Sequence, residues 1–300
     1  MEEQQNQETH RKNWHDRHYK TLLLIPLALL IFSIVYLGIF YSQHNDIFLK
    51  DISLSGGTSA TINGKLDTSS LEKELTKEFG EVKIRVISDL ITGEQLATII
   101  DTTANSEDTR TFLEEYLGYE LTEENSSFEF SESSFTKDLY RQLIIALLLA
   151  FLLMTIVVFI LFRNFIPSLT VVSCVLIDMI MTITLIDILG IKISTGGIIA
   201  FLMLIGYSVD TDILLTNRIL KRHEGTLNQK TLGAFKTGIT MTLTSLFAVV
   251  AALFVVKSFS AILTQIFLII SIGLFFDIIN TWITNVSILK WYINSKERQK

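Results

Sequence analysis

Residues 142–162 read QLIIALLLAFLLMTIVVFILF, a continuous apolar run without a charged side chain. An α-helix needs roughly 20 mostly apolar residues to cross the hydrocarbon core of a bilayer. A chain in lipid must satisfy its backbone polar groups internally, which a helix does. The run therefore predicts a membrane-spanning helix.

Five further runs have the length and composition of membrane spans: 21–41, 168–189, 196–217, 237–256 and 261–282. The first follows a basic tail, as the apolar core of a secretory signal would. Its length of about 20 residues exceeds the 7–15 of such a core, and no A-x-A-like cleavage site follows. We interpret it as an uncleaved anchor, so the chain is expected to be a polytopic α-helical membrane protein with six transmembrane helices.

The overall composition excludes several other classes of protein. Of the 300 residues, 49% are hydrophobic and 19% are charged, with one cysteine and a net charge of −6. A single cysteine cannot form an intramolecular disulfide, and the negative charge offers no footprint for nucleic acid. Disorder, nucleic-acid binding and a disulfide scaffold are therefore disfavoured, and membrane lipid is the expected surrounding.

Lysine and arginine in the short loops predict the orientation. Fourteen of these residues fall on one side of the predicted spans and two, Lys192 and Lys257, on the other. The basic side includes both ends of the chain, residues 1–20 and 293–300. We expect a multi-pass protein of the cell membrane with both termini in the cytoplasm and residues 42–137 outside.

The segment 42–137 carries 19 acidic and 8 basic residues and has regular patterning. Strands are expected over 51–63, 82–86, 96–100 and 127–131; helices are expected to be capped by Ser69 and Ser106 and ended by Gly80 and Gly118. The resulting β-α-β-β-α-β order is that of a ferredoxin-like fold. We predict an α+β extracytoplasmic domain; Asn125 begins an N-x-S sequon within it, which a chance match in a turn explains equally well.

Five aspartates lie within the predicted spans, where a charge is costly: Asp178, Asp187, Asp210, Asp212 and Asp277. Asp178 is expected near mid-membrane and Asp187 near the outer edge. On a helix, Asp210 and Asp212 point about 200° apart, so only one of them can face a given partner. They could form a proton relay, or they could be structural, with Arg218 or Lys236 neutralising Asp210 or Asp212.

Other motifs of site chemistry are missing or weak. Lys236 opens a hydroxyl-rich span, KTGITMTLTS, whose side chains could pack between helices or line a wet path. No nucleotide-binding, zinc-protease or nucleophile-elbow motif occurs. We predict no metal, no cofactor and no enzymatic activity.

Three segments resemble the SecF family of protein-export subunits, which belongs with SecD to the RND transporter superfamily. Gly56, Gly57 and Thr58 resemble its GGT element. Residues 204–212, LIGYSVDTD, with Gly206, Tyr207 and Ser208, resemble its fourth-span signature, which Asn217-Arg218 follows. Residues 236–240 resemble the start of its fifth span.

The chain departs from the bacterial pattern of that family. The single bacterial aspartate aligns with Thr211, and Asp210 and Asp212 flank that position, an arrangement of the archaeal type. The bacterial arginine is replaced by Lys236. Asp277 falls where bacterial members usually have glycine, so the resemblance implies no role for it.

The resemblance implies an accessory subunit of the Sec translocase that assists export of unfolded preprotein with SecD and the SecY channel, driven by the proton-motive force. An alternative is a small-molecule or lipid exporter of the RND superfamily, although about 100 outer residues leave little room for a substrate tunnel. A membrane-embedded enzyme or a sensor is a third interpretation. An enzyme should show a cluster of His, Glu or Ser at one depth of the membrane, and a sensor should carry a cytoplasmic output domain; the sequence indicates neither.

Overall fold

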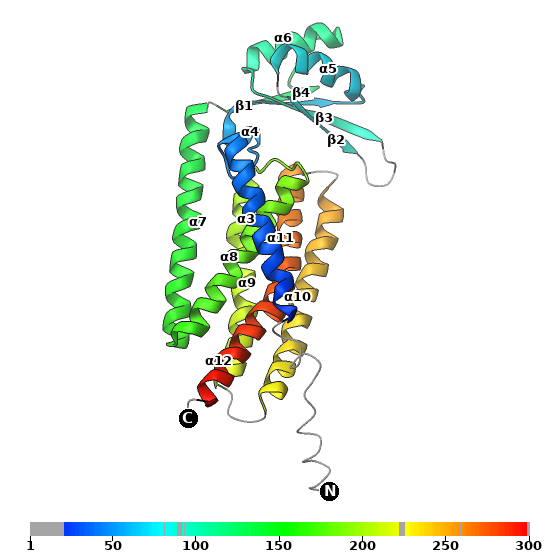
Figure 1. The fold of residues 1–300 in the computed structure, drawn as a ribbon. Helices are drawn as coiled ribbons and strands as arrows, with labels where there is room; N and C mark the ends of the chain where they lie inside the picture. The colour runs from blue at the N-terminus through cyan, green and yellow to red at the C-terminus, as the bar shows by residue number, and fades with distance from the viewer. Residues whose placement is uncertain are drawn as a thin grey trace.

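The computed structural model describes residues 21–80, 82–88, 92, 94–131, 133–221, 226–257 and 260–298. The predicted cytoplasmic segment 1–20 and Gly93 of an expected turn lie outside the described residues. A bundle of long helices carries a small α+β domain at one end (Figure 1). We call this end of the bundle the domain end and the opposite one the far end.

Six candidate membrane spans are present among the described residues, as predicted. The helices that form them are α3 (Leu24–His44), α7 (Ser133–Phe162), α8 (Phe165–Ile188), α9 (Thr195–Lys221), α10 (Leu227–Val256) and α11 (Ala261–Ile279), the last continuing through a π-helical segment, η1 (Asn280–Asn285), into α12 (Val286–Arg298). The last helix thus extends well past residue 282, where the apolar run ends.

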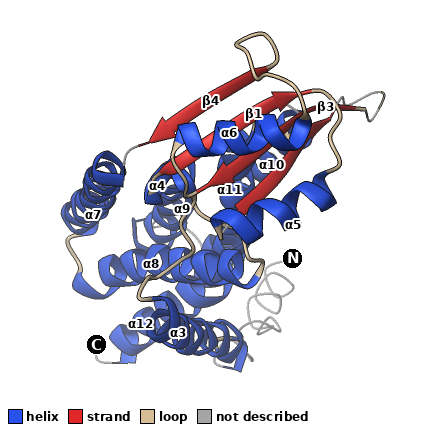
Figure 2. Cartoon of the chain, turned by 90° about the horizontal axis from the view of Figure 1, so that it is seen from above, coloured by secondary structure: helices blue, strands red, loops and turns tan. Residues whose placement is uncertain are grey.

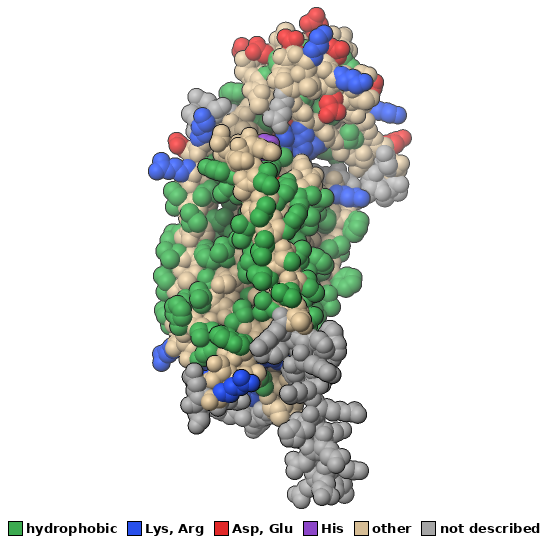
Figure 3. All heavy atoms as spheres, in the orientation of Figure 1, with side chains coloured by type: hydrophobic (Ala, Val, Ile, Leu, Met, Phe, Trp, Pro, Cys, Tyr) green, Lys and Arg blue, Asp and Glu red, His purple; other side chains and the backbone are tan. Residues whose placement is uncertain are grey.

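The side chains on the bundle surface match a lipid environment. On the face shown in Figure 3, hydrophobic side chains cover the bundle, lysines and arginines lie above and below them, and the carboxylates lie above. About half of α8 and α9 is buried inside the bundle, whereas α3, α7 and α10 are mostly exposed. Helices α8 and α9 therefore form the centre, where polar side chains can be kept from lipid.

The domain contains four strands and two helices in the predicted order: β1 (Gly57–Asn63), α5 (Thr68–Phe79), β2 (Val82–Ser88), β3 (Gln95–Thr102), α6 (Ser106–Leu117) and β4 (Ser126–Ser131). The sheet order is β2-β3-β1-β4 and each neighbouring pair is antiparallel. This is the split β-α-β arrangement of a ferredoxin-like domain.

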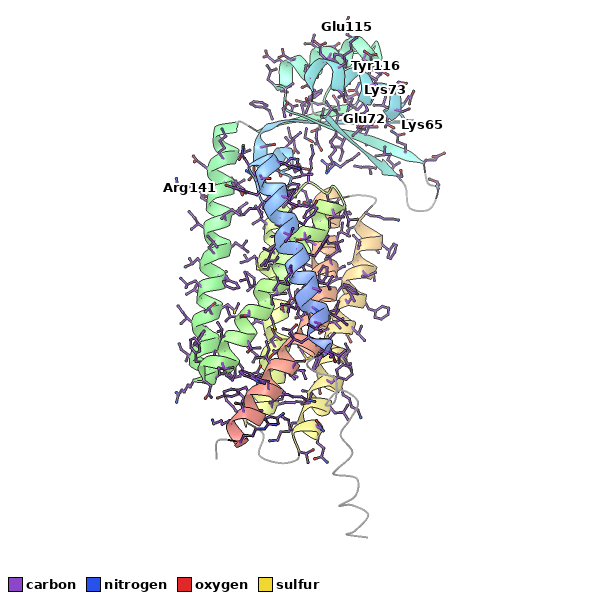
Figure 4. All side chains as sticks on the ribbon, in the orientation of Figure 1. Lys65, Glu72, Lys73, Glu115, Tyr116 and Arg141 are labelled. Carbon is purple, nitrogen blue, oxygen red and sulfur yellow. The ribbon has the colours of Figure 1, made fainter. Side chains whose placement is uncertain are left out.

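Helices α5 and α6 cover the face of the sheet that points away from the bundle (Figure 2). Their apolar faces close a core with strands β1 and β3, formed by Ala60, Ile62, Leu71, Leu75, Ile100, Leu113 and Leu121. Their polar faces point outward: Glu72 and Lys73 of α5 and Glu115 of α6 lie on the outer surface (Figure 4).

The helix starts in this region differ from the predicted ones. Residues 51–63 do not form one strand, because α4 (Ile52–Ser55) occupies the first part, with the Asp51 carboxylate accepting from Ser53 N. Helix α5 is capped by Asp67, two residues before the predicted Ser69, and α6 by Asn105. In each case an Asx side chain one residue ahead of the helix satisfies a free backbone N–H.

Hydrogen bonds join the base of the domain to the bundle. Ile193 N donates to Leu49 O at 2.7 Å, and Asp51 N donates to Ile193 O at 2.9 Å. Lys83 of the edge strand β2 lies 3.9 Å from the Asp51 carboxylate. Burial lowers the pKa of Lys83, an effect partly offset by Asp51. The loop between α8 and α9 thus fixes the segment that enters the domain.

Candidate functional site

Three buried aspartates from three different helices meet inside the bundle. Asp178 comes from α8, Asp212 from α9 and Asp277 from α11, and none of the three has exposed surface. We call these residues, with the side chains that bond them, the carboxylate cluster. Because a buried carboxylate is costly without partners, their hydrogen bonds decide what the cluster can do.

Asp178 is bonded on both oxygens by neutral donors. Ser208 Oγ of α9 donates to Oδ2 at 2.6 Å, and Asn280 Nδ2 of η1 donates to Oδ1 at 2.6 Å. Ser208 belongs to the family-like segment 204–212, so that segment supplies both a carboxylate and a donor to the cluster.

Asp212 and Asp277 share one hydroxyl. Thr281 Oγ1 lies 2.8 Å from Asp212 Oδ1 and 3.2 Å from Asp277 Oδ1. Asn285 Nδ2 donates to the same Asp212 oxygen at 2.7 Å. Asp212 Oδ2, Asp277 Oδ2 and Asn285 Oδ1 are buried without a hydrogen-bond partner. Each buried polar atom without a partner lowers the stability of the fold by about 1–3 kcal/mol, so the cluster destabilises the bundle.

The π-helical segment η1 brings the amide donors onto one side. Asn280 and Asn285 are five residues apart, which places them about 140° apart on an α-helix of 3.6 residues per turn. In a π-helix the backbone hydrogen bonds connect residues five apart, so two such residues lie nearly one above the other on the same side. Segments of this kind occur frequently at functional sites. Both side chains consequently reach the cluster, Asn280 at Asp178 and Asn285 at Asp212.

Replacing Gly238 with alanine is expected to destabilise this arrangement. A Cβ at Gly238 of α10 would lie 2.5 Å from Cζ2 of the Trp282 ring, which is part of η1. Because the buried ring cannot bend away, we expect a loss of roughly 1–3 kcal/mol, as for an overpacked core. Thermal unfolding in detergent, followed by tryptophan fluorescence, measures it.

The matched control is Gly206→Ala, since a Cβ there meets nothing within 4 Å. Equal unfolding temperatures for the two variants would show that η1 can move away from α10 without cost.

The candidate neutralising cations do not reach the aspartates. In the described part of the chain, neither Arg218 nor Lys236 forms an ion pair. Arg218 Nη1 donates instead to the backbone oxygen of Gly233 in α10, and Lys236 is exposed. The alternative in which Arg218 or Lys236 neutralises Asp210 or Asp212 has no ion pair to support it among the described residues.

The two aspartates of the fourth span have opposite surroundings. Asp212 is fully buried in the cluster, whereas Asp210 is exposed on the outer face of α9, together with Gly206 and Tyr207. The structure thus separates two candidates that the sequence left equivalent. Asp277, for which the resemblance implied no role, lies inside the cluster.

The residues of the GGT element, Gly56, Gly57 and Thr58, lie outside the carboxylate cluster, at the base of the α+β domain. Gly56 and Gly57 have φ angles of 90° and 138°, which side chains rarely adopt. Thr58 is buried, and its Oγ1 donates to Ala104 O at 2.8 Å. These three residues build the entry of the chain into the sheet and have no part in the cluster.

Three residues of the cluster, Asn280, Thr281 and Asn285, were missed by the sequence analysis. Asp277, Asn280, Thr281, Thr284 and Asn285 follow the spacing i, i+3, i+4, i+7, i+8. On an α-helix these positions form a stripe about 140° wide, with Asn280 and Asn285 at its two edges, so a broad polar stripe within an apolar span was the available signal. Among the described residues, no group of three or more His, Cys, Asp or Glu side chains is arranged to hold a metal ion.

The comparisons with known proteins agree with this architecture. The family model described as "Protein export membrane protein SecD/SecF, C-terminal" matches residues 114–295. A protein-export membrane protein SecF from Methanothermobacter thermautotrophicus is 35% identical, with 92% of this chain and 93% of that protein covered. A SecF from Methanocaldococcus jannaschii is also 35% identical, with 95% and 99% covered.

Two solved structures share the fold. The crystal structure of SecDF, a translocon-associated membrane protein from Thermus thermophilus, has a TM-score of 0.71 at 20% identity, and the super-membrane-facing form of SecDF has a TM-score of 0.60. In both cases 92% of this chain is covered but only 38% of the longer SecDF chain.

A bundle of six candidate spans with carboxyl groups buried inside it and an α+β domain at one end is the architecture of a polytopic membrane protein. The two relatives reported above are both described as protein-export membrane proteins. The chain belongs to the SecD/SecF family of protein-export membrane proteins, and its full-length relatives are SecF proteins of archaea.

Proposed function

We propose that this chain is an accessory subunit of the Sec preprotein translocase, which acts with a SecD-type chain to assist export of unfolded proteins through the SecY channel. The observation that carries the proposal is that it aligns over nearly its whole length with SecF proteins. Its match to 38% of a SecDF chain supports the view that it forms one half of a larger assembly.

The exposed charges of α9 and α10 support a partner within the membrane. Asp210 lies within the apolar run of α9 and is exposed, and Lys236, at the start of the apolar run of α10, is exposed as well. A carboxylate that faces lipid is costly, by about 3 kcal/mol at the centre of a span. A second membrane chain that covers Asp210 would remove this cost, and a SecD-type chain is the partner that the family implies.

The orientation follows from the positive-inside rule. The basic residues favour the far end of the bundle, where α3 begins and α12 ends, and the acidic domain is at the opposite end (Figure 1). We place both termini in the cytoplasm and the domain outside the cell membrane, where it can meet emerging preprotein.

The carboxylate cluster is the proposed site of coupling to the proton gradient. It holds three carboxyl groups without a cation partner among the described residues, near the middle of the helices. Burial without a countercharge disfavours the charged form of a carboxyl group, so these groups are suited to proton uptake and release. A change of charge there would act on the packing of α8 and α9, whose connecting loop is bonded to the base of the domain.

Co-purification tests the partner. A tagged chain extracted from its native membranes in mild detergent is expected to bring down a second six-span chain of the SecD type. Asp210→Ala and Lys236→Ala should reduce that recovery several-fold, because they remove the charges on the exposed face. Glu115→Ala, on the outer surface of α6, is the control and should leave it unchanged. A homo-oligomer with no second chain would contradict the proposal.

A further inference from the structure

The hydrogen atoms available in the carboxylate cluster determine where a proton must sit. A threonine hydroxyl has one hydrogen to donate and lone pairs to accept. Thr281 lies within hydrogen-bond distance of two carboxyl groups, and the shorter contact, 2.8 Å, is with Asp212. Its hydrogen therefore belongs to Asp212, and the 3.2 Å contact with Asp277 needs a hydrogen from another source.

The neighbouring donors are already committed. Ser208, which also neighbours Asp277, donates its single hydroxyl hydrogen to Asp178 at 2.6 Å. The amides of Asn280 and Asn285 donate to Asp178 and Asp212. Asp178 and Asp212 thus each receive two donors, as a carboxylate anion requires. Ser208 and Thr281 are the hydroxyls next to Asp277, and the shorter contact of each is with another aspartate. Among the described residues no donor hydrogen therefore remains for Asp277, which is fully buried and has one oxygen without a hydrogen-bond partner.

The charges around Asp277 act in the same direction. The titratable groups that face it are Asp178 and Cys174 from α8 and Asp212 from α9, and none of them is a cation. Three anions in a site of low dielectric repel one another, so at least one of them is neutralised by a proton. The donor count identifies Asp277 as the group that must carry one.

We propose that Asp277 is the resting proton site of the cluster: a neutral carboxylic acid that donates its hydrogen to Thr281 Oγ1 while Thr281 donates to Asp212. The protonation state stands on the contacts alone; its use in transport rests on the proposed function. In the bacterial pattern of the family this position is usually glycine, so the resemblance implies no such role for Asp277.

The arrangement also defines a transfer. The Asp277 proton passes to Thr281 Oγ1, and in the same step the Thr281 hydrogen passes to Asp212. One O–H bond breaks and one forms at threonine, Asp277 becomes the anion and Asp212 the acid. The charge moves between α11 and α9 without a free ion crossing lipid, which links the proton's position to contacts between these helices.

Infrared spectroscopy of the purified full chain in detergent at neutral pH tests the proposal. A protonated carboxylic acid gives a C=O stretching band that lies apart from the amide bands and shifts in D₂O. We expect one such band from within the bundle, and its complete loss in Asp277→Asn. Asp46→Asn, at an exposed site beyond the span, is the control and should not change it.

A second variant keeps the test decisive if Asp277→Asn fails to fold. Thr281→Val keeps the shape but removes the acceptor, so the band should move to higher frequency. An unchanged band in both variants, or loss of the band in Asp212→Asn but not in Asp277→Asn, would overturn the assignment. Export assays test the proposed function separately from the protonation state. A chain that holds this proton but exports protein without any dependence on the proton gradient would refute only the coupling of export to that gradient.

Discussion

Asp212→Asn is expected to abolish the part of preprotein export that depends on the proton gradient. Asparagine preserves the shape of the side chain but cannot bind or release a proton at neutral pH. Asp212 is fully buried, with donors Thr281 and Asn285 at 2.8 and 2.7 Å. If charge at this position is exchanged during transport, the neutral variant stays in one state and the gradient cannot act on it.

The assay follows the movement of a Sec-dependent preprotein into inside-out membrane vesicles, with and without an imposed pH gradient. The variant should export at the same rate in both conditions, whereas the unaltered chain should be faster with the gradient. Asp46→Asn is the matched control, since its exposed ion pair with Lys50 is worth at most about 1 kcal/mol. A gradient response that survives in Asp212→Asn would remove Asp212 from the coupling site.

Gly57→Ala is expected to have the largest effect on the stability of the α+β domain. A Cβ at Gly57 would lie 2.2 Å from the backbone oxygen of Thr102, and the φ of 138° is one that side chains rarely adopt. The clash is with the backbone of the central strand β3, so the pairing of β1 with β3 must be distorted. Overpacking and backbone strain together should cost roughly 2–6 kcal/mol.

Hydrogen exchange of the full chain, read by mass spectrometry, measures this loss in the amides of β1 and β3. Gly64→Ala is the matched control: its φ is 106°, but a Cβ there meets nothing within 4 Å. It should show only the strain, about 1–3 kcal/mol. Equal protection in the two variants would mean that the approach of Gly57 to Thr102 is not needed. The GGT element is thus explained here by backbone packing.

Local patterns explain how much of the fold the sequence could predict. Six apolar runs specify six helices because lipid leaves the backbone no other partner than itself. Alternating residues such as Val82, Ile84 and Val86 specify strands because one face of the sheet is covered and the other is not. The helix starts were predicted one or two residues off, since Asp67 and Asn105 compete with nearby serines for the same role.

The candidate site could be predicted only in part. That Asp210 and Asp212 point in different directions follows from helix geometry, but which of them faces inward depends on how α9 is rotated against α8 and α11. The tertiary structure buries Asp212 and exposes Asp210. The same packing directs Arg218 to a backbone carbonyl and leaves Lys236 outside, so no cation of the described segments pairs with the buried carboxylates.

By itself, the sequence determined a six-span membrane protein with an acidic α+β domain, because hydropathy and alternation are properties of neighbouring residues. Only the tertiary structure decided that Asp178, Asp212 and Asp277 meet. Their positions lie up to 99 residues apart on three helices, and the π-helical segment that supplies Asn280 and Asn285 has a register that no local pattern specifies. Contacts between helices are set by side-chain packing across the whole bundle, and the chemistry of the site depends on those contacts.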